Sequence, residues 1–588
     1  MNQFGFSLLT RYSEIVRISN GELQGLSDGK SESFLGVPFA LPPTGRFRFM
    51  RPQSISGFSW EGVKHARKTA PMCLQRAGFF LSTPITGSED CLYLNVYRPV
   101  SVSSGDDLPV MVFIPGGAFS VGGSYWMQGQ SDGSVLAHQE NVIVVVLSYR
   151  LNVMGFLATE QLQAANGGTV GNLGLQDQQE ALRWVKREIN FFGGDPDRVL
   201  LFGESAGAFS VLWHSINIAS RDEKLFSSVI AQSASSDLSW FYQQKDQAFQ
   251  LYDSYVKFLG CPSDKVDQLG CLQSIKAEQF LEAWGAWSES FLRGGDKSGH
   301  LSPEEVPLLQ SVSGFGPVVD GHVAGMLDVP YRLIEKGEFH RVPFVAGITR
   351  DEGSIFSLVI PPTVISQQIL FAPERWKEIF GLILTSPESL GSLHALYPFN
   401  KPGDAVAGFQ WSSEIIRDFV FGCSTEETAL NWSKYAPAYL YLFSGTLGSV
   451  GAWTGVGAMH SFDIFYIFRT FPPGTEFLIN NGREQKVASE MGARWASMAR
   501  TGSPNPTKSD QVMMNVMIEW PEYKSSEENI LEFGGVGNLK DPPSRLIDRN
   551  AVDKTVWPEK EKCSFWKTQR PLPWIHLSTK SVNTKKQI

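Results

Sequence analysis

Six short runs of the sequence are apolar at every position, without the alternation of polar and apolar residues that marks a half-exposed strand. Strands buried on both faces are typical of a parallel sheet that helices cover from both sides. Between two of the runs, the stretch 177–190 gathers its large apolar residues on one face, which predicts an amphipathic helix. The apolar runs are 110–114, 142–147, 199–202, 229–231, 344–346 and 439–443.

The beginning of the chain predicts a different kind of strand pairing. The stretch 14–23 alternates partly between polar and apolar residues and contains Asn20-Gly21, a pair that favours a tight hairpin. We therefore expect an α/β fold with a large, mostly parallel central sheet, an antiparallel N-terminal edge and helices on both faces. In such sheets ligands bind beyond the carboxyl ends of the strands, so reactive residues are expected directly after the apolar runs.

The length of 588 residues would by itself suggest several domains, but the organisation of the chain favours one. Between residues 23 and 574 there is neither a long linker rich in Pro, Gly and Ser nor a run of like charges. The hydrophobic content of 42% supplies enough apolar area for a large core. We predict one α/β domain over residues 12–576 with long insertions, and a polar, basic and flexible tail over 577–588.

The balance of charges excludes some classes of partner. Lys and Arg number 51 and Asp and Glu number 60, so the formal net charge is −9, and the basic residues are dispersed along the chain. Binding to a nucleic acid or an anionic membrane surface would favour a basic stripe instead. No stretch approaches the roughly 18 to 20 consecutive apolar residues that a membrane-spanning helix needs. We expect a soluble protein with no nucleic-acid partner and no transmembrane segment.

The six cysteines bear on the compartment of the protein. Their even number and spacing suggest disulfides, although six cysteines allow 15 connectivities and buried free thiols are the alternative. Disulfides would indicate an oxidising compartment. The sequon Asn431-Trp432-Ser433 is a glycosylation candidate compatible with secretion. We predict a secreted or secretory-lumen location, although residues 1–11 show neither the basic segment nor the cleavage site of a signal peptide.

The clearest chemical motif follows the run 199–202. Gly203-Glu204-Ser205-Ala206-Gly207 matches G-x-S-x-G between a predicted buried strand and a helix. Small residues are needed two positions either side of the serine, because a Cβ there would collide with the neighbouring strand or helix. The pattern also occurs at 25–29 and 129–133, but neither match directly follows a buried run, and we interpret both as polar turns. Ser205 is the predicted nucleophile.

A serine hydroxyl becomes nucleophilic only with a base in hydrogen-bond reach and a third group that orients this base. After a motif of this kind the acid precedes the histidine in the chain. Among the histidines downstream of Ser205, His460 stands out because it follows a Gly-rich loop that comes after a buried run. The turn after the run 344–346 offers two acids, Asp351 and Glu352, and the residues alone do not decide between them. A solvated turn is the alternative interpretation.

Acyl transfer also requires donors that stabilise an oxyanion, and these are usually backbone N–H groups. Gly116-Gly117-Ala118 follow the run 110–114, and adjacent glycines at the end of a strand let several N–H groups point at one oxygen. We predict that the N–H groups of Gly117, Ala118 and Ala206 form an oxyanion hole. A tight glycine turn without function is the alternative.

Several further segments accompany these motifs, namely Gly36-Val37-Pro38-Phe39-Ala40, Ser88-Glu89-Asp90-Cys91-Leu92-Tyr93-Leu94-Asn95-Val96, Ser148-Tyr149-Arg150, Gly171-Asn172-Leu173-Gly174-Leu175 and 191–196. Together they resemble the type-B carboxylesterase and cholinesterase family from about Gly21 to Trp574. The resemblance implies an α/β-hydrolase fold and a serine ester hydrolase that acts on a small-molecule ester without a metal or an organic cofactor.

The resemblance also assigns individual residues. In this family the acid is the Glu of Asp-Glu-Gly-Ser, which matches Glu352, and the base matches His460. It further implies disulfides and structural ion pairs, namely Cys73–Cys91, Cys261–Cys271, Cys423–Cys563, Arg48–Glu89 and Arg150–Asp177.

Two positions of the oxyanion loop depart from the family pattern of His or Tyr followed by three glycines. Pro115 replaces the first residue and Ala118 the last glycine. Alanine still carries an N–H group, so the hole can form, with altered geometry. Relatives that lack the serine or the histidine use the fold for adhesion, and a non-catalytic binding module is therefore the rival hypothesis. All three catalytic positions are filled here, which favours catalysis.

The predicted substrate sites depart from the family as well. Cholinesterases have a choline-binding Trp between the first two cysteines, whereas this shorter segment has only Phe79 and Phe80, so the cation–π platform is missing. The acyl-pocket Phe pair aligns near Ser311 and Ser313, which predicts a pocket for larger acyl groups. We therefore expect a carboxylesterase rather than a cholinesterase.

Overall fold

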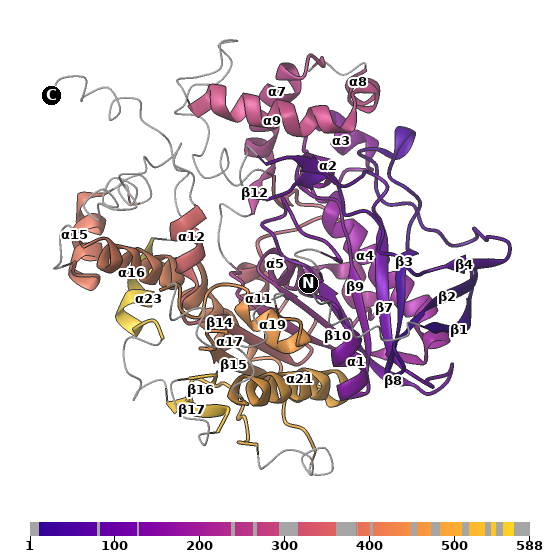
Figure 1. The fold of residues 1–588 in the computed structure, drawn as a ribbon. Coiled ribbons are helices and arrows are strands. Elements are labelled where there is room, and N and C mark those ends of the chain that lie inside the picture. The colour runs from indigo at the N-terminus through magenta and orange to yellow at the C-terminus, as the bar shows by residue number, and fades with distance from the viewer. Residues whose placement is uncertain are drawn as a thin grey trace, which may run out of the picture.

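A 13-stranded sheet runs through the molecule in the computed structural model (Figure 1). Its strands are β1 Arg11–Ile18, β2 Gly21–Ser27, β3 Ser31–Pro38, β4 Val63–His65, β7 Tyr93–Pro99, β8 Leu108–Ile114, β9 Ile143–Leu147, β10 Gly194–Glu204, β11 Ser228–Gln232, β14 Phe344–Thr349, β15 Ala438–Phe443, β16 Asn529–Phe533 and β17 Ser544–Asp548. Two small ribbons pair β5 Gln75–Arg76 with β6 Ile85–Thr86 and β12 Gln243–Gln244 with β13 Val318–Val319.

The structure describes the greater part of the chain. The described residues are 11–78, 83–125, 129–236, 242–262, 267–292, 315–359, 384, 386–399, 404–447, 455–471, 482–507, 517–535, 542–548 and 557–569. The predicted tail at 577–588 lies outside them.

The order of the strands confirms the predicted sheet. It reads β1-β2-β3-β7-β9-β8-β10-β11-β14-β15-β16-β17, with β4 beside β2. Along this order all pairings from β9 to β16 are parallel, whereas those from β1 to β9 at one edge and that of β17 at the other are antiparallel. The short strand β4 pairs in parallel with β2. The predicted hairpin is present, but it turns at Ser19 and Asn20, one residue before the predicted pair, since Gly21 already belongs to β2 and is the partner of Ile18. The antiparallel strand β17 at the far edge was not predicted.

Each apolar run became part of a parallel strand, from β8 to β15, and every residue of the runs is buried. Burial is possible on both faces because helices cover both. One face packs against Trp184 and Trp213 of α4 and α5, and the other against Trp495 of α21. The helices are α1 Ser134–Glu140, α2 Asn152–Phe156, α3 Glu160–Ala165, α4 Leu173–Glu188, α5 Ala206–Ile216, α6 Ile218–Asp222, α7 Lys245–Phe258, α8 Gln268–Ser274, α9 Ala277–Leu292, α11 Pro330–Lys336, α12 Gly353–Val359, α15 Pro387–Leu396, α16 Ala405–Ile416, α17 Cys423–Trp432, α19 Phe462–Phe468, α21 Arg483–Thr501 and α23 Lys560–Thr568, with 3₁₀ turns η1 Gly45–Phe47 and η3 Ile189–Phe192 and a π-helical segment η4 Arg417–Gly422.

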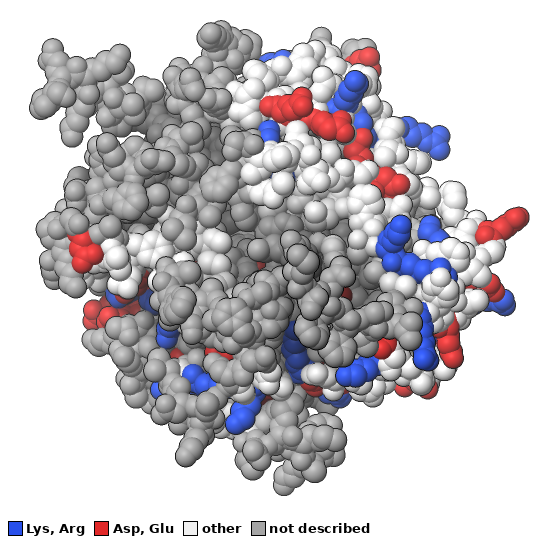
Figure 2. Space-filling view, viewed as in Figure 1, with Lys and Arg blue, Asp and Glu red and all other residues white. Residues whose placement is uncertain are grey.

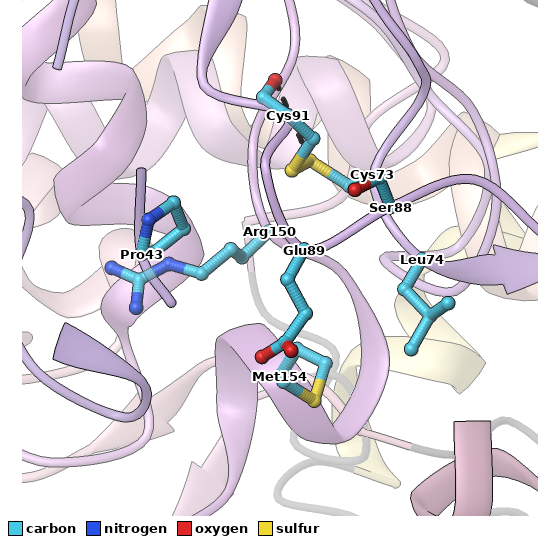
Figure 3. Close-up of a pocket in the computed structure, with 8 residues that line it drawn as sticks. All are labelled: Pro43, Cys73, Leu74, Ser88, Glu89, Cys91, Arg150 and Met154. Carbon is cyan, nitrogen blue, oxygen red and sulfur yellow. Dashed lines mark hydrogen bonds between the residues drawn. A yellow bond between two sulfur atoms is a disulfide. The ribbon is translucent and has the colours of Figure 1, made fainter. Parts of the chain in front are cut away.

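Three disulfides join Cys73 to Cys91, Cys261 to Cys271 and Cys423 to Cys563, the pairings that the family resemblance implied. The first lies beside a cavity of about 10 Å³ that Glu89 and Arg150 also line (Figure 3). That volume holds at most one water molecule, so an ester cannot bind there. Glu89 and Arg150 each belong to one of the two structural ion pairs that the resemblance implied, Arg48–Glu89 at 2.6 Å and Arg150–Asp177 at 2.7 Å.

The surface is mixed in charge. Figure 2 shows basic and acidic residues interspersed over the described part of one face, as the dispersed Lys and Arg residues of the sequence predicted. Within the described ranges, none of the helices combines the length and the apolar character that crossing a membrane requires.

Candidate active site

Ser205 lies at a sharp turn between β10 and α5, at the carboxyl edge of the sheet. Its backbone has φ 54° and ψ −126°, a conformation that L-residues rarely adopt. The turn is held by bonds to its neighbours: the N–H of Ser205 donates to the carbonyl of Gln232 at 2.9 Å, and its own carbonyl accepts from the N–H of Phe209 at 2.9 Å. Strain of this kind persists only where surrounding structure fixes it.

The two motif glycines permit this turn. A Cβ on Gly203 would lie 2.6 Å from the carbonyl carbon of Gly207, and a Cβ on Gly207 would lie 1.9 Å from the carbonyl oxygen of Ile114. Both obstacles are backbone atoms, which cannot rotate away. The structure thus gives the reason for the small residues on which the prediction of Ser205 rested.

Glu352 and His460 meet at the same edge of the sheet. Glu352 follows β14, and His460 lies between β15 and α19. The carboxylate oxygen Oε2 of Glu352 contacts Nδ1 of His460, and its Oε1 accepts from Ser233 Oγ at 2.5 Å and from the N–H of Thr349 at 2.7 Å. Glu352 is fully buried. The partners on Oε1 hold the carboxylate in one orientation, and the carboxylate in turn orients the ring.

The other ring nitrogen of His460 faces a second carboxylate. Oε1 of Glu204 lies 3.0 Å from Nε2, and the Ser461 hydroxyl donates to this same oxygen at 2.5 Å. Nε2 forms no hydrogen bond to the residues that the structure describes, so it retains the capacity to bond a hydroxyl. Glu204 directly precedes Ser205, which brings Nε2 to the segment that carries the predicted nucleophile.

The buried carboxylates control the charge of this imidazole. Burial disfavours the charged ring, but Glu204 and Glu352 outweigh it and raise the pKa of His460 to about 9. Burial raises the pKa of Glu204 to about 7. Burial also raises the pKa of Asp463 to about 6, against hydrogen bonds from Gln232 and Tyr441 that each measure 2.8 Å. The site therefore favours a proton on His460.

Two aromatic rings pack on the imidazole. The centroids of Phe356 in α12 and Phe421 in η4 lie 5.1 Å and 5.0 Å from that of His460, and the two phenyl rings are 5.6 Å apart. Phe421 belongs to the π-helical segment, a kind of distortion often found at functional sites. These contacts restrict rotation of the ring.

The predicted oxyanion loop passes next to Ser205. A Cβ on Gly116 would lie 3.1 Å from the Cβ of Ser205, and a Cβ on Gly117, at φ +115°, would lie 2.0 Å from the carbonyl oxygen of Val121. Ala118 has φ 53°, in the left-handed region that usually favours glycine. The N–H groups of Gly117 and Ala118 are bonded to no acceptor in the described part of the chain, which leaves them free to bind a substrate oxygen.

Comparisons with known proteins identify the family of the chain. The model of the carboxylesterase family matches residues 12–566. The chain belongs to the carboxylesterase family.

Relatives of this carboxylesterase-family chain include the mouse (Mus musculus) cholinesterase, 30% identical over 94% of this chain and 86% of the relative, and acetylcholinesterase 1 of Caenorhabditis briggsae, 30% identical over 92% and 84%. Among solved structures, a PNB esterase is similar with a TM-score of 0.70 and 26% identity, covering 93% of this chain and all of that one. A thermophilic PNB esterase is similar with a TM-score of 0.70 and 26% identity, over 94% and 99%. As a member of this family, the chain is a carboxylic ester hydrolase with the α/β-hydrolase fold.

Several residues around the imidazole were missed by the sequence analysis. Glu204 occupies a variable position of G-x-S-x-G, but it directly precedes the serine, so its proximity could have been anticipated. Asp463 lies in the first turn of α19, only three residues after His460, so its proximity could have been anticipated as well. Ser233 could have been found because it directly follows β11, at the reactive edge. Phe421 has no comparable signal, since a π-helical segment is not recognisable in the sequence.

Other predicted residues lie elsewhere. Asn431 is in the last turn of α17, where its Oδ1 accepts from Lys434 Nζ at 2.7 Å. Glycosylation of Asn431 stays a prediction. The first of the two other G-x-S-x-G matches was wrongly interpreted as a turn alone, because its residues up to Ser27 belong to β2, where Leu26 pairs with Ser33. The positions that bear on choline and acyl recognition lie outside the described residues: Phe79, Phe80, Ser311 and Ser313.

Proposed function

We propose that this carboxylesterase-family protein cleaves its esters through an acyl-enzyme on Ser205, with His460 as general base and Glu352 as the group that orients it. The observation that carries the proposal is the position of His460. Its Nδ1 contacts a fully buried carboxylate, while its Nε2 is unbonded within the described residues and faces the segment that bears the strained serine.

The mechanism follows from the roles of these groups. His460 Nε2 takes the proton of the Ser205 hydroxyl as Oγ attacks the ester carbonyl, and Glu352 stabilises the imidazolium that results. The N–H groups of Gly117, Ala118 and Ala206 bind the oxyanion of the tetrahedral intermediate. The imidazolium then protonates the departing alcohol, and the carbonyl reforms as an acyl-enzyme on Ser205.

Deacylation repeats these steps with water. His460 removes a proton from water, the hydroxide attacks the acyl carbon, and the collapse of the second intermediate returns the proton to Ser205 Oγ as the acid leaves. Glu204 assists both stages electrostatically, because its carboxylate lies 3.0 Å from Nε2 and stabilises the protonated ring.

The proposal is tested by comparing the wild type with Ser205→Ala on a p-nitrophenyl butyrate substrate. We expect kcat/KM to fall by about 10³-fold or more, because loss of the nucleophile leaves only the oxyanion hole and binding. An organophosphonate should add its mass to the peptide containing Ser205 in the wild type and not in the variant. Equal rates for the two proteins would reject the nucleophile and reopen the binding-module hypothesis.

We further propose one catalytic domain over residues 12–576 and secretion of the protein, with Asn431 as a glycan acceptor. Three disulfides support an oxidising compartment. To test the glycan, the protein is expressed in a secreting eukaryotic host, and its mass is measured before and after treatment with a glycosidase. A mass loss in the wild type that is absent in the variant Asn431→Gln would assign the glycan to Asn431. An unchanged mass of the wild type would exclude a glycan at this site.

A further inference from the structure

The two adjacent acids between which the sequence did not decide have different partners in the structure. Glu352 contacts the imidazole of His460. Asp351 instead contacts the backbone that leads to this histidine: its N–H donates to the carbonyl of Ala458 at 3.0 Å, and its Oδ2 accepts from the N–H of Ala458 at 2.7 Å. Both backbone groups of one residue are thus bound by the same acid.

The approach of the two segments requires a glycine. Gly457 has φ +66°, and a Cβ at this position would lie 2.1 Å from Oδ2 of Asp351. The carboxylate therefore occupies the space that any larger residue at 457 would need. The contact between Asp351 and Ala458 can therefore form only when the loop before His460 passes this close to Asp351.

Asp351 is itself held firmly, as an anchor must be. Its carbonyl accepts from the N–H of Ser354 at 3.1 Å and from the Ser354 hydroxyl at 2.8 Å. The preceding residue, Arg350, donates its N–H to the carbonyl of Phe443 at the end of β15 at 2.8 Å. The turn is thereby tied both to α12 and to the strand from which the histidine loop departs.

The turn consequently holds the histidine loop at two points. Asp351 binds Ala458, and the next residue, Glu352, binds the side chain of His460, two residues further along the loop. Fixing the backbone near the imidazole limits the positions that Nε2 can reach, and misplacing a reacting group by about 1 Å can cost on the order of a hundredfold in rate.

We propose that Asp351 is a positioning residue that places His460 by binding the backbone of Ala458, an inference that rests on the proposed role of His460 as base. An ion pair with Arg350 is the competing explanation for this acid, because Arg350 Nε lies 3.4 Å from Oδ2. Both side chains are partly exposed, and such pairs contribute little to stability.

Three single variants separate these explanations. Asp351→Ala removes the acceptor and should lower kcat about 30- to 100-fold with KM changed less than about threefold, because the base is misplaced while binding is kept. Asp351→Asn keeps an oxygen acceptor without the charge and should recover most of kcat. Arg350→Met removes the ion pair and should leave kcat unchanged. Losses of kcat in Asp351→Asn and Arg350→Met as large as that in Asp351→Ala would favour the ion pair, and unchanged kcat in Asp351→Ala would exclude any role of this acid; either result would overturn the proposal.

A pair of variants at the glycine tests the contact itself. Gly457→Ala should lower kcat about tenfold or more, because the Cβ displaces the loop from Asp351. In the background of Asp351→Ala the carboxylate is absent, so the same change should lower kcat about threefold or less. That remaining loss would come from backbone strain at the positive φ of residue 457. Independent, multiplicative losses would show that the two residues do not act through one contact and would overturn the proposal.

Proton NMR provides a readout that does not depend on catalysis. The Nδ1–H of His460 bonded to a carboxylate gives a downfield resonance, which should broaden or move in Asp351→Ala, stay in Asp351→Asn and vanish in His460→Ala. If Ser205→Ala remained active, the proposed acyl-enzyme mechanism would be wrong, but the Nδ1–H resonance of His460 would still report on the position of the histidine loop. An unaltered signal in Asp351→Ala would reject the positioning role alone.

Discussion

The turn that carries Ser205 and the loop that carries His460 are fixed in different ways. Ser205 is placed by main chain: a parallel strand leads into it, a helix leaves it, and glycines let neighbouring backbones approach to contact distance. The segment around His460 is placed by side chains, namely two acids of the preceding turn, a third acid beside Nε2 and two phenyl rings.

Because of this difference, we expect substitutions in the two regions to affect different properties, folding at the serine turn and catalysis around the histidine. Changes at the serine turn act on packed backbone and should damage the fold, whereas changes around the histidine replace single side-chain contacts and should alter rate or pH dependence in a folded protein. The five predictions below test this contrast.

The largest effect is expected at the serine turn. Gly207→Ala places a Cβ 1.9 Å from the carbonyl oxygen of Ile114, between a strand and a helix that cannot separate. We expect destabilisation of more than about 4 kcal/mol, or no folded protein. Urea unfolding of any soluble product measures this. A variant as stable as the wild type would show that the turn is less constrained than its contacts indicate.

Next in size is the change Glu352→Gln, which keeps the shape of the side chain but removes its charge. The imidazolium loses its stabilisation and the ring loses its preferred tautomer, so we expect kcat to fall about 10³- to 10⁴-fold. The melting temperature should drop far less than for Gly207→Ala. If Glu352→Gln prevented folding while Gly207→Ala folded, the contrast between the two regions would be reversed.

A moderate effect is expected from Glu204→Gln. This carboxylate contributes to raising the pKa of His460 to about 9, and the base must be neutral to act, so activity rises as pH increases through this pKa. The variant should shift the acidic limb of kcat/KM to lower pH by about one unit. Glu223→Gln, which removes an exposed acid, is the matched control and should leave the profile unchanged. A limb that stays in place would exclude this role of Glu204.

The same pKa predicts how stability depends on pH. The pKa of His460 in the folded protein lies above the unfolded value of about 6.5, so binding of this proton favours the fold. That contribution is complete below pH 6.5 and is lost as pH rises through 9. Glu204→Gln should reduce it, which denaturant titrations at pH 6 and pH 9 would measure.

The smallest effect is expected in the oxyanion loop. Ala118 has φ 53°, which costs an L-residue more than glycine, and Ala118→Gly keeps the N–H group. We expect a gain in stability of about 0.5–1 kcal/mol and a kcat within about threefold of the wild type. A loss of about a hundredfold in kcat would show that the methyl group itself positions the donors.

Sequence patterns predicted the features that depend on periodicity and local steric demand. Continuous apolar runs identified six parallel strands of the large sheet, β8, β9, β10, β11, β14 and β15, and the glycines around Ser205 identified the sharp turn. They failed where contacts join distant segments. Asp351 and Glu352 follow the same strand and have similar chemistry, and only the path of the loop before His460 gives them different partners. The packing of Phe421 depends on a π-helical segment that has no sequence signature.

The bridge between Cys423 and Cys563 closes a loop of 140 residues that contains His460, while Ser205 and Glu352 lie outside it. A protease that cuts once within this loop would therefore produce two polypeptides that migrate together until a reductant is added. On a non-reducing gel the cleaved protein would be indistinguishable from intact enzyme, and it would still contain His460. Purity and activity should accordingly be judged on reduced samples.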